Sequence, residues 1–127
     1  LIDDIVEKYN IDRSRIYLTG QSMGSYGVWD LSVRKPNFFA AAIMISGGGD
    51  INTVVNLLEL PMKMYNSEKD PLVPSRGAKS ITQKFKEFKS HHFTYKEYEG
   101  AAHNIWHRVW RSEKIIEWMF SKKRSSN

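Results

Sequence analysis

Apolar residues recur near the start of the chain at the spacing of one helical face. Charged residues fill the positions between them, so residues 2–9 predict an amphipathic helix, which Asn10 can end in a left-handed conformation. A β-branched and aromatic run at residues 15–19 then predicts a strand. The apolar residues of the predicted helix are Ile2, Ile5, Val6 and Tyr9.

The middle of the chain alternates between helical and extended patterns. A helix follows the first strand, turns Val28 and Leu31 inward, with Trp29 as a further candidate, and stops at Pro36. The almost unbroken apolar run at residues 40–46 is typical of a parallel strand buried on both faces. Residues that fit either a short helix or an irregular crossover follow at positions 51–60.

The last third of the chain predicts two further strands and two further helices. A third strand covers residues 62–66 after Pro61, a helix follows Ser75, and residues 93–99 alternate like an outermost strand. The inner face of the helix after Ser75 consists of Ala78, Ile81, Phe85 and Phe88. A last helix over residues 105–121 buries Trp106, Val109, Trp110, Ile116 and Met119 or Phe120.

This alternation predicts an α/β fold in three layers, with a parallel sheet between helices on both faces. We find no internal repeat, no low-complexity stretch and no linker, so residues 1–127 are interpreted as a single domain. A chain of 127 residues is long enough to bury a core.

A Gly-x-Ser-x-Gly motif joins the first predicted strand to the helix that follows it. Gly20 and Gly24 are expected to lie too close to their neighbours to carry a Cβ atom. Ser22 is expected at the tip of the turn, in a strained conformation that exposes its Oγ. The following helix directs backbone N–H groups toward that point, which favours an oxyanion there. The motif in this context predicts a nucleophile elbow.

Three side chains with complementary chemistry follow three separate strands. Ser22 follows the first strand, Asp70 the third and His103 the fourth, and the carboxyl ends of parallel strands meet at one edge of a sheet. A serine hydroxyl needs an imidazole to take its proton, and the imidazole needs a carboxylate to orient it. The pattern therefore predicts a nucleophile, an acid and a base at one site.

Other acidic residues and histidines compete for these roles. Asp50 follows the second strand, and Glu68 lies in the same loop as the favoured acid. His91 and His92 precede the last strand, at the wrong end for this site, and His107 falls inside the last helix. The loop at residues 47–49 has no Lys-Ser or Lys-Thr after it, so we interpret it as a flexible rim and not as a phosphate loop.

Four segments carry a resemblance to a known family. The chain resembles the C-terminal part of an α/β-hydrolase of the esterase or predicted-peptidase type. Such enzymes are similar to polyhydroxybutyrate depolymerases and feruloyl esterases and, more distantly, to prolyl oligopeptidases. Ser25 departs from the family pattern, which often has glycine there, and the first strands of the fold are not in this sequence. The segments are residues 20–27, 38–43, 70–74 and 100–106.

The resemblance implies a serine carboxylesterase that works through an acyl-enzyme, with Ser22 as nucleophile, Asp70 as acid and His103 as base. It also implies that the Met23 N–H is one oxyanion donor, while the second donor comes from a loop outside this sequence. The alternatives are a serine peptidase of prolyl-oligopeptidase type and a non-catalytic fragment or interaction module. Candidates for the substrate pocket are Gln21, Tyr26 and Trp106.

Composition narrows the choice of partners. The net charge is +5, but the aromatic residues fall at core spacings, so no nucleic-acid surface is predicted. Cysteine is absent and the histidines lack metal-ligand spacing, so we expect neither a metal nor a cofactor. No apolar run reaches spanning length, and no membrane association is predicted. The expected ligand is a small-molecule ester.

The first residue is Leu1, and no charged-then-apolar leader follows it. We therefore expect the chain to be a piece of a longer protein. The helix at residues 2–9 and one edge of the sheet would then lack partners, which predicts either a homo-oligomer or pairing with the missing N-terminal part.

Overall fold

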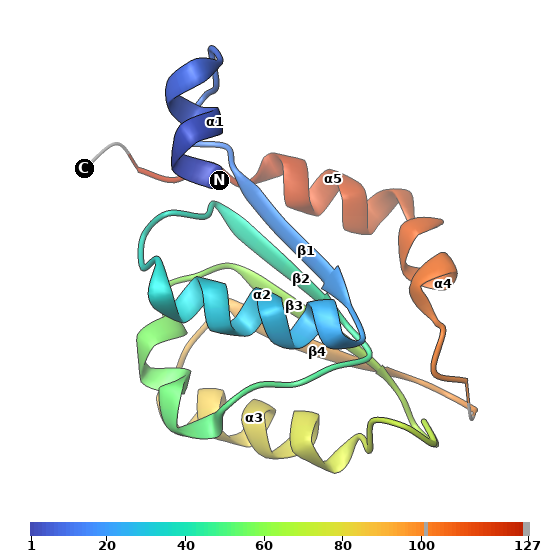
Figure 1. The fold of residues 1–127 in the computed structure, drawn as a ribbon. Helices are drawn as coiled ribbons and strands as arrows, with labels where there is room; N and C mark the ends of the chain where they lie inside the picture. Colours follow the sequence, from blue (N-terminus) through green and yellow to red (C-terminus); the bar gives the residue numbers. More distant parts are fainter. Residues whose placement is uncertain (101, 126–127) are drawn as a thin grey trace.

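The structure, a computed structural model, describes residues 1–100 and 102–125. Helices and strands alternate along most of the chain (Figure 1). In chain order they are α1 (Ile2–Lys8), β1 (Tyr17–Gln21), α2 (Met23–Arg34), β2 (Ala41–Ile45), the 3₁₀ helix η1 (Ile51–Leu57), β3 (Met62–Ser67), α3 (Arg76–Glu87), β4 (Phe93–Tyr98), α4 (Trp106–Trp110) and α5 (Glu113–Ser121).

The four strands form one parallel sheet in the order β1-β2-β3-β4, so each strand lies beside the strand that precedes it in the chain. Figure 1 shows α2 and α3 on one side of the sheet and α5 on the other. This arrangement confirms the predicted α/β fold with its parallel sheet and two helical layers. It also confirms that the strand near residues 93–99 is outermost.

The core consists of two apolar clusters, one on each face of the sheet. Ala42 and Met44 of β2 pack in the cluster that contains α2, α3 and η1 residues, whereas Ile43 and Ile45 pack against α4 and α5. All five residues of β2 are buried. A strand covered on both faces needs apolar side chains at every position, which is why its sequence shows no alternation.

The last helical segment differs from its prediction. The chain leaves helical geometry at Ser112, which has φ −82° and ψ 107° and precedes α5. This break changes which side chains face the sheet, so that Ile115 is buried and Ile116 is only half-buried. Phe120 is exposed, and its ring packs edge-on against Tyr17 at the surface.

Smaller differences concern the ends of elements. Tyr9, and not Asn10, ends α1, and it does so in an extended conformation with φ −115°. β1 begins and ends two residues later than predicted, because its pairing with β2 runs from Tyr17 to Gln21. Phe88 lies just past the end of α3, where its ring is exposed beside the ammonium group of Lys84.

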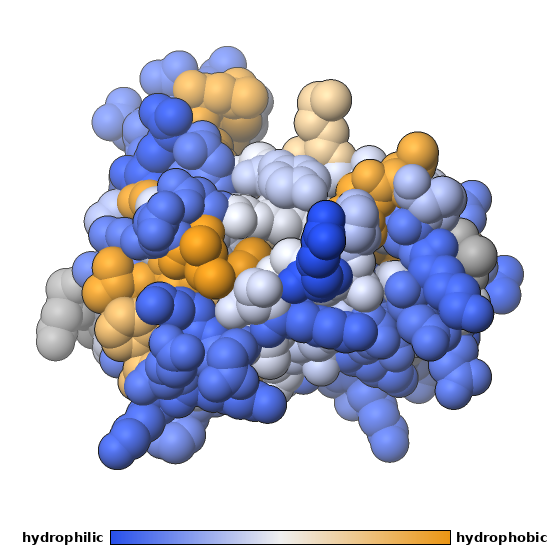
Figure 2. Space-filling view, turned by 90° about the horizontal axis from the view of Figure 1, so that it is seen from below, coloured by the Kyte–Doolittle hydropathy of each residue, from blue (hydrophilic) through white to orange (hydrophobic). Residues whose placement is uncertain are grey.

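The start of the chain leaves apolar surface uncovered. Of the α1 residues, only Val6 is buried, while Ile5 is 39% exposed and Tyr9, just after the helix, 59%. β1 forms an edge of the sheet, with β2 as its partner. The face seen from below is mainly hydrophilic, with hydrophobic residues in separate groups (Figure 2).

Within the described ranges, no helix is both long and apolar enough to span a bilayer.

Candidate active site

Ser22 lies in the sharp turn between β1 and α2. Its backbone has φ 55°, the left-handed region that a non-glycine residue seldom adopts, so the predicted strain is present. Its N–H donates to the carbonyl oxygen of Ile45 at 2.8 Å, which anchors the turn to the end of β2. A Cβ on Gly20 would overlap the backbone of Gly24, as expected, but a Cβ on Gly24 would meet no atom within 4 Å. The expected crowding at Gly24 is therefore wrong.

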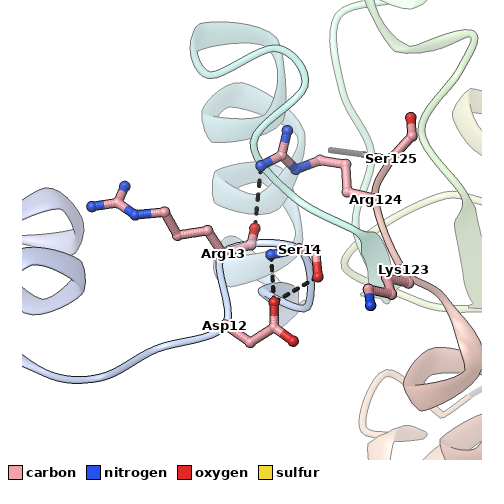
Figure 3. A pocket seen from close by; sticks show the side chains of 6 residues that line it. All are labelled: Asp12, Arg13, Ser14, Lys123, Arg124 and Ser125. Carbon is pink, nitrogen blue, oxygen red and sulfur yellow. Dashed lines mark hydrogen bonds between the residues drawn. The ribbon is translucent and has the colours of Figure 1, made fainter. Parts of the chain in front are cut away.

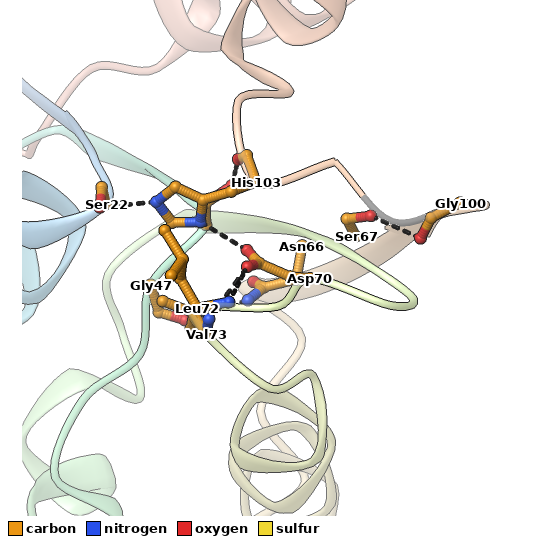
Figure 4. A network of polar contacts seen from close by, with 10 residues as sticks. Ser22, Gly47, Asn66, Ser67, Asp70, Leu72, Val73, Gly100 and His103 are labelled. Carbon is orange, nitrogen blue, oxygen red and sulfur yellow. Dashed lines mark hydrogen bonds and ion pairs between the residues drawn. The ribbon is translucent and has the colours of Figure 1, made fainter.

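Two short contacts join side chains from three different loops. Ser22 Oγ lies 2.8 Å from Nε2 of His103, and Nδ1 of the same ring lies 2.6 Å from Oδ2 of Asp70. Figure 4 shows the imidazole between the hydroxyl and the carboxylate. These residues follow β1, β3 and β4, so the loops at the carboxyl edge of the sheet bring them together.

Asp70 is held as a carboxylate by its surroundings. Its side chain is fully buried, and its Oδ1 accepts hydrogen bonds from the N–H groups of Leu72 at 2.8 Å and Val73 at 2.9 Å. Burial by itself raises the pKa of Asp70, but the hydrogen bonds from His103, Val73 and Leu72 outweigh it and leave that pKa below its ordinary value.

The protonation of Asp70 determines the tautomer of the neutral histidine. An ionised carboxylate can only accept hydrogen bonds, so Nδ1 of His103 carries the hydrogen in the contact with Asp70. Nε2 is then an acceptor, and the Ser22 hydroxyl donates to it. The arrangement suits removal of a proton from Ser22.

Three buried polar residues that the sequence analysis did not single out connect the loops of this edge. Ser46 Oγ donates to the His103 carbonyl at 2.6 Å, Ser67 Oγ donates to Gly100, and Asn66 Nδ2 donates to Gly47. Figure 4 shows the contacts of Ser67 and Asn66 beside Asp70. Ser46 directly follows β2, and Asn66 and Ser67 are the last two residues of β3, so all three lie at the carboxyl ends of strands. In the sequence, these residues could have been recognised as polar residues at the carboxyl end of a buried strand.

Comparison with known proteins matches residues 1–117 to the phospholipase/carboxylesterase family. The chain belongs to this family of α/β-hydrolases. The predicted resemblance is thus confirmed. A comparison with curated protein sequences found no match.

Several solved structures share the fold of this chain. A thermostable esterase superposes with a TM-score of 0.91 and 36% sequence identity, over 97% of this chain and 35% of the esterase. SOBER1 of Arabidopsis thaliana gives a TM-score of 0.68 at 17% identity, over 94% of this chain and 56% of SOBER1. An acylaminoacyl peptidase of Pyrococcus horikoshii gives 0.81 at 17% identity, over 99% and 27%. The chain therefore spans about a third of the length of the thermostable esterase.

The competing residues of this α/β-hydrolase chain lie in other environments. Asp50 accepts a hydrogen bond from Asn52 N–H at the start of η1, and Glu68 is exposed. His92 directly precedes β4, at the opposite end of the strands from Ser22, and its ring lies 3.5 Å from the carboxylate of Glu59. The other two histidines, His91 and His107, are exposed.

The three candidates for the substrate pocket differ in exposure and in the residues that they contact. The Trp106 ring packs edge-on against that of His103, with centroids 6.2 Å apart. Tyr26 is 47% exposed on α2, and its ring lies beside Gly48. Gln21 is exposed at the end of β1, and the side chain of Met23 is 85% exposed at the start of α2.

The glycine run after β2 is a packed segment and not the flexible rim that was expected. A Cβ on Gly47 would lie 2.3 Å from Cβ of Ser25, and a Cβ on Gly49 would overlap the ring of Trp29. Gly47 and Gly48 are buried. Glycine is required here because α2 approaches the backbone closely.

A cavity of about 670 Å³ opens at the other end of the sheet, before β1 (Figure 3). Asp12 accepts hydrogen bonds from Ser14 there, and Arg124 donates to the Arg13 carbonyl. The cavity lies far along the strands from Ser22 and contributes nothing to its contacts. In the part of the chain that the structure describes, no group of three or more His, Asp or Glu side chains has a metal-binding arrangement.

Proposed function

We propose that this chain carries the nucleophile, base and acid of a serine carboxylesterase. The observation that supports this is the pair of contacts that joins Ser22 Oγ, the His103 ring and Asp70 at 2.8 and 2.6 Å. A nucleophile, an adjacent base and a carboxylate that orients the base are the groups that acyl transfer requires.

The reaction would proceed in two halves. His103 Nε2 takes the Ser22 proton while Oγ bonds to the ester carbonyl carbon, and the imidazolium then protonates the leaving alcohol as its C–O bond breaks. Water, deprotonated by His103, next attacks the acyl group on Ser22, and the serine leaves with the proton. Asp70 stabilises the imidazolium in both halves.

The oxyanion formed in each half needs hydrogen-bond donors. Met23 is the first residue of α2, and N–H groups in the first turn of a helix have no partner within the helix. We assign its N–H as one donor and expect the second from another part of the protein. Loss of one such donor typically costs about 10²–10³ in rate.

An ester is the proposed substrate in preference to a peptide. The family description and the esterase at 36% identity support this choice, whereas the peptidase at 17% identity supports the fold alone. The test is to compare turnover of p-nitrophenyl butyrate with that of the p-nitroanilide of the same acid. Faster turnover of the anilide would contradict the proposal.

The proposed nucleophile is tested by reaction with a fluorophosphonate probe followed by peptide mapping. We expect the complete protein to be labelled at Ser22 and the Ser22→Ala variant to lose both the label and ester turnover. Ser80→Ala is the matched control, because Ser80 is an exposed serine on α3. Turnover that survives in Ser22→Ala would reject Ser22 as the nucleophile, whereas a complete protein with neither label nor turnover would favour a non-catalytic role.

We also propose that the uncovered surfaces of α1 and the β1 edge pair with the rest of the protein. Apolar helix faces and open strand edges promote association. Residues 1–127 produced alone are therefore expected to self-associate when their mass is measured by light scattering. A stable monomer would count against this need for a partner.

A further inference from the structure

The end of β2 contacts both sides of the reaction centre. The carbonyl oxygen of Ile45 accepts the Ser22 N–H at 2.8 Å. The next residue, Ser46, donates from its Oγ to the carbonyl oxygen of His103 at 2.6 Å. Two consecutive residues on one rigid strand end therefore hold the backbones of Ser22 and His103, which are 81 positions apart in the chain.

Ser46 is itself rigidly placed. Its side chain is fully buried, and its N–H donates to the Tyr65 carbonyl at 2.8 Å in continuation of the pairing with β3. Its backbone has φ 52°, so it occupies the left-handed region without being glycine. A buried hydroxyl on a fixed backbone offers its hydrogen bond in one direction.

The other anchors of the His103 loop lie on either side of the histidine. The Gly100 carbonyl accepts hydrogen bonds from Ser67 Oγ at 2.9 Å and from Lys69 N–H at 2.8 Å. On the other side, the Ile105 side chain is fully buried. These contacts hold the two ends of the loop, whereas the histidine's own carbonyl accepts hydrogen bonds from the Ser46 hydroxyl at 2.6 Å and, within the loop, from the Ile105 N–H at 3.1 Å.

We propose that Ser46 is a positioning residue, whose hydrogen bond to the His103 carbonyl sets the separation between His103 Nε2 and Ser22 Oγ. This role rests on the proposed function of Ser22 and His103. It does not bring Ser46 into contact with substrate. Without the hydroxyl, the loop keeps its ends but loses its tie to the strand that also holds Ser22.

The proposal predicts a loss in the chemical step and not in substrate binding. A misplacement of about 1 Å between reacting groups can cost on the order of 10²-fold in rate. Because the loop keeps its other anchors, we expect kcat to fall about 10-fold when the hydroxyl is removed. KM should stay within about twofold, because substrate binding does not use the Ser46 hydroxyl.

The experiment uses two substitutions at Ser46 in the complete protein. Ser46→Ala removes the hydroxyl and keeps the Cβ, whereas Ser46→Gly removes the hydroxyl and relieves the left-handed backbone. Ser90→Ala is the matched control, because Ser90 Oγ donates to the Leu58 carbonyl at 2.8 Å near the opposite edge of the sheet. The measurements are kcat and KM on p-nitrophenyl butyrate, the rate of fluorophosphonate reaction at Ser22, and Tm.

The expected result separates positioning from stability. Both Ser46 variants should lose about the same factor in kcat and in the rate of reaction at Ser22, although Ser46→Gly has the higher Tm of the two. Ser90→Ala should have a lower Tm than the unsubstituted protein and an unchanged kcat. If kcat in either Ser46 variant stays within about twofold of the unsubstituted protein, or follows Tm across the three variants, the positioning role is wrong and the proposed function stands. An unreactive Ser22 in the unsubstituted protein would overturn both.

Discussion

A Cβ atom on Gly20 would lie 2.3 Å from the carbonyl oxygen of Gly24, whereas nothing lies within 4 Å of a Cβ on Gly24. The two glycines of the Gly-x-Ser-x-Gly motif therefore have different roles. We expect Gly20→Ala to lower the free energy of unfolding by about 3 kcal/mol, since rigid backbone must move to admit the methyl group.

Gly24→Ala is the matched control for this prediction. Gly24 is the second residue of α2, where alanine favours the helix, so its stability should be unchanged or higher by about 0.5 kcal/mol. Urea unfolding of both variants measures the difference. Equal losses at the two positions would show that the approach of the chain at Gly20 is not what requires glycine.

Removal of the Asp70 charge should affect the reaction far more than the fold. In Asp70→Asn the amide no longer requires a hydrogen on Nδ1 of His103, so the ring can adopt the tautomer that cannot accept from Ser22. We expect kcat for an ester to fall by about 10³–10⁴. The measurement is steady-state turnover of p-nitrophenyl butyrate.

The rival acids provide controls for Asp70. Asp50→Asn and Glu68→Gln change carboxylates that follow β2 and β3 without contacting His103. Both variants should retain turnover within about threefold. A loss of turnover in Asp50→Asn as large as in Asp70→Asn would transfer the role of the acid to the loop after β2.

Asp70 should also contribute to stability in a pH-dependent way. Its folded pKa lies below the ordinary 3.8, so its contribution is present above that pH and is lost as pH falls through the lower folded pKa. The difference in unfolding free energy between the unsubstituted protein and Asp70→Asn should therefore be constant near neutral pH and change below about pH 4. A difference that stays flat down to pH 2 would contradict this prediction.

The raised pKa of the Tyr65 phenol predicts that the protein loses stability at alkaline pH. Burial, with a smaller effect of Tyr98, raises the pKa of Tyr65 from 10.0 to about 12. Between these values the unfolded phenol ionises while the folded one keeps its proton, so stability falls as pH rises. Tyr65→Phe removes this group and should reduce the loss between pH 9 and pH 12 by on the order of 2–3 kcal/mol. Equal losses with and without the hydroxyl would contradict the shift.

The parallel sheet was predictable from the sequence because a strand that is buried on both faces has an unbroken apolar run, which can be recognised without knowing its neighbours. Residues 41–45 are buried on both faces and are apolar throughout, and the strands occur in chain order. The contacts of Ser22 with His103 and of His103 with Asp70 join residues that the pattern had already placed at one edge. In a parallel sheet, that edge collects every loop after a strand.

Other features depend on tertiary contacts that leave no local pattern. The break at Ser112 occurs without proline or glycine, and the residues on either side of it, Val109 of α4 and Ile115 of α5, pack in the same apolar cluster. The difference between Gly20 and Gly24 depends on how closely one turn of α2 approaches β1. The role of the Ser46 hydroxyl requires knowing which carbonyl lies opposite it, 57 positions away.

The order of the strands has a consequence for biosynthesis. Each strand pairs with the one translated just before it, so the sheet can grow in the direction of synthesis. His103 comes after the last strand, and its contact with Ser22 closes the longest loop of the site. Reactivity of Ser22 would then be acquired only after β4 and the His103 loop have folded, and a nascent chain that stalls before β4 would display the serine without its base.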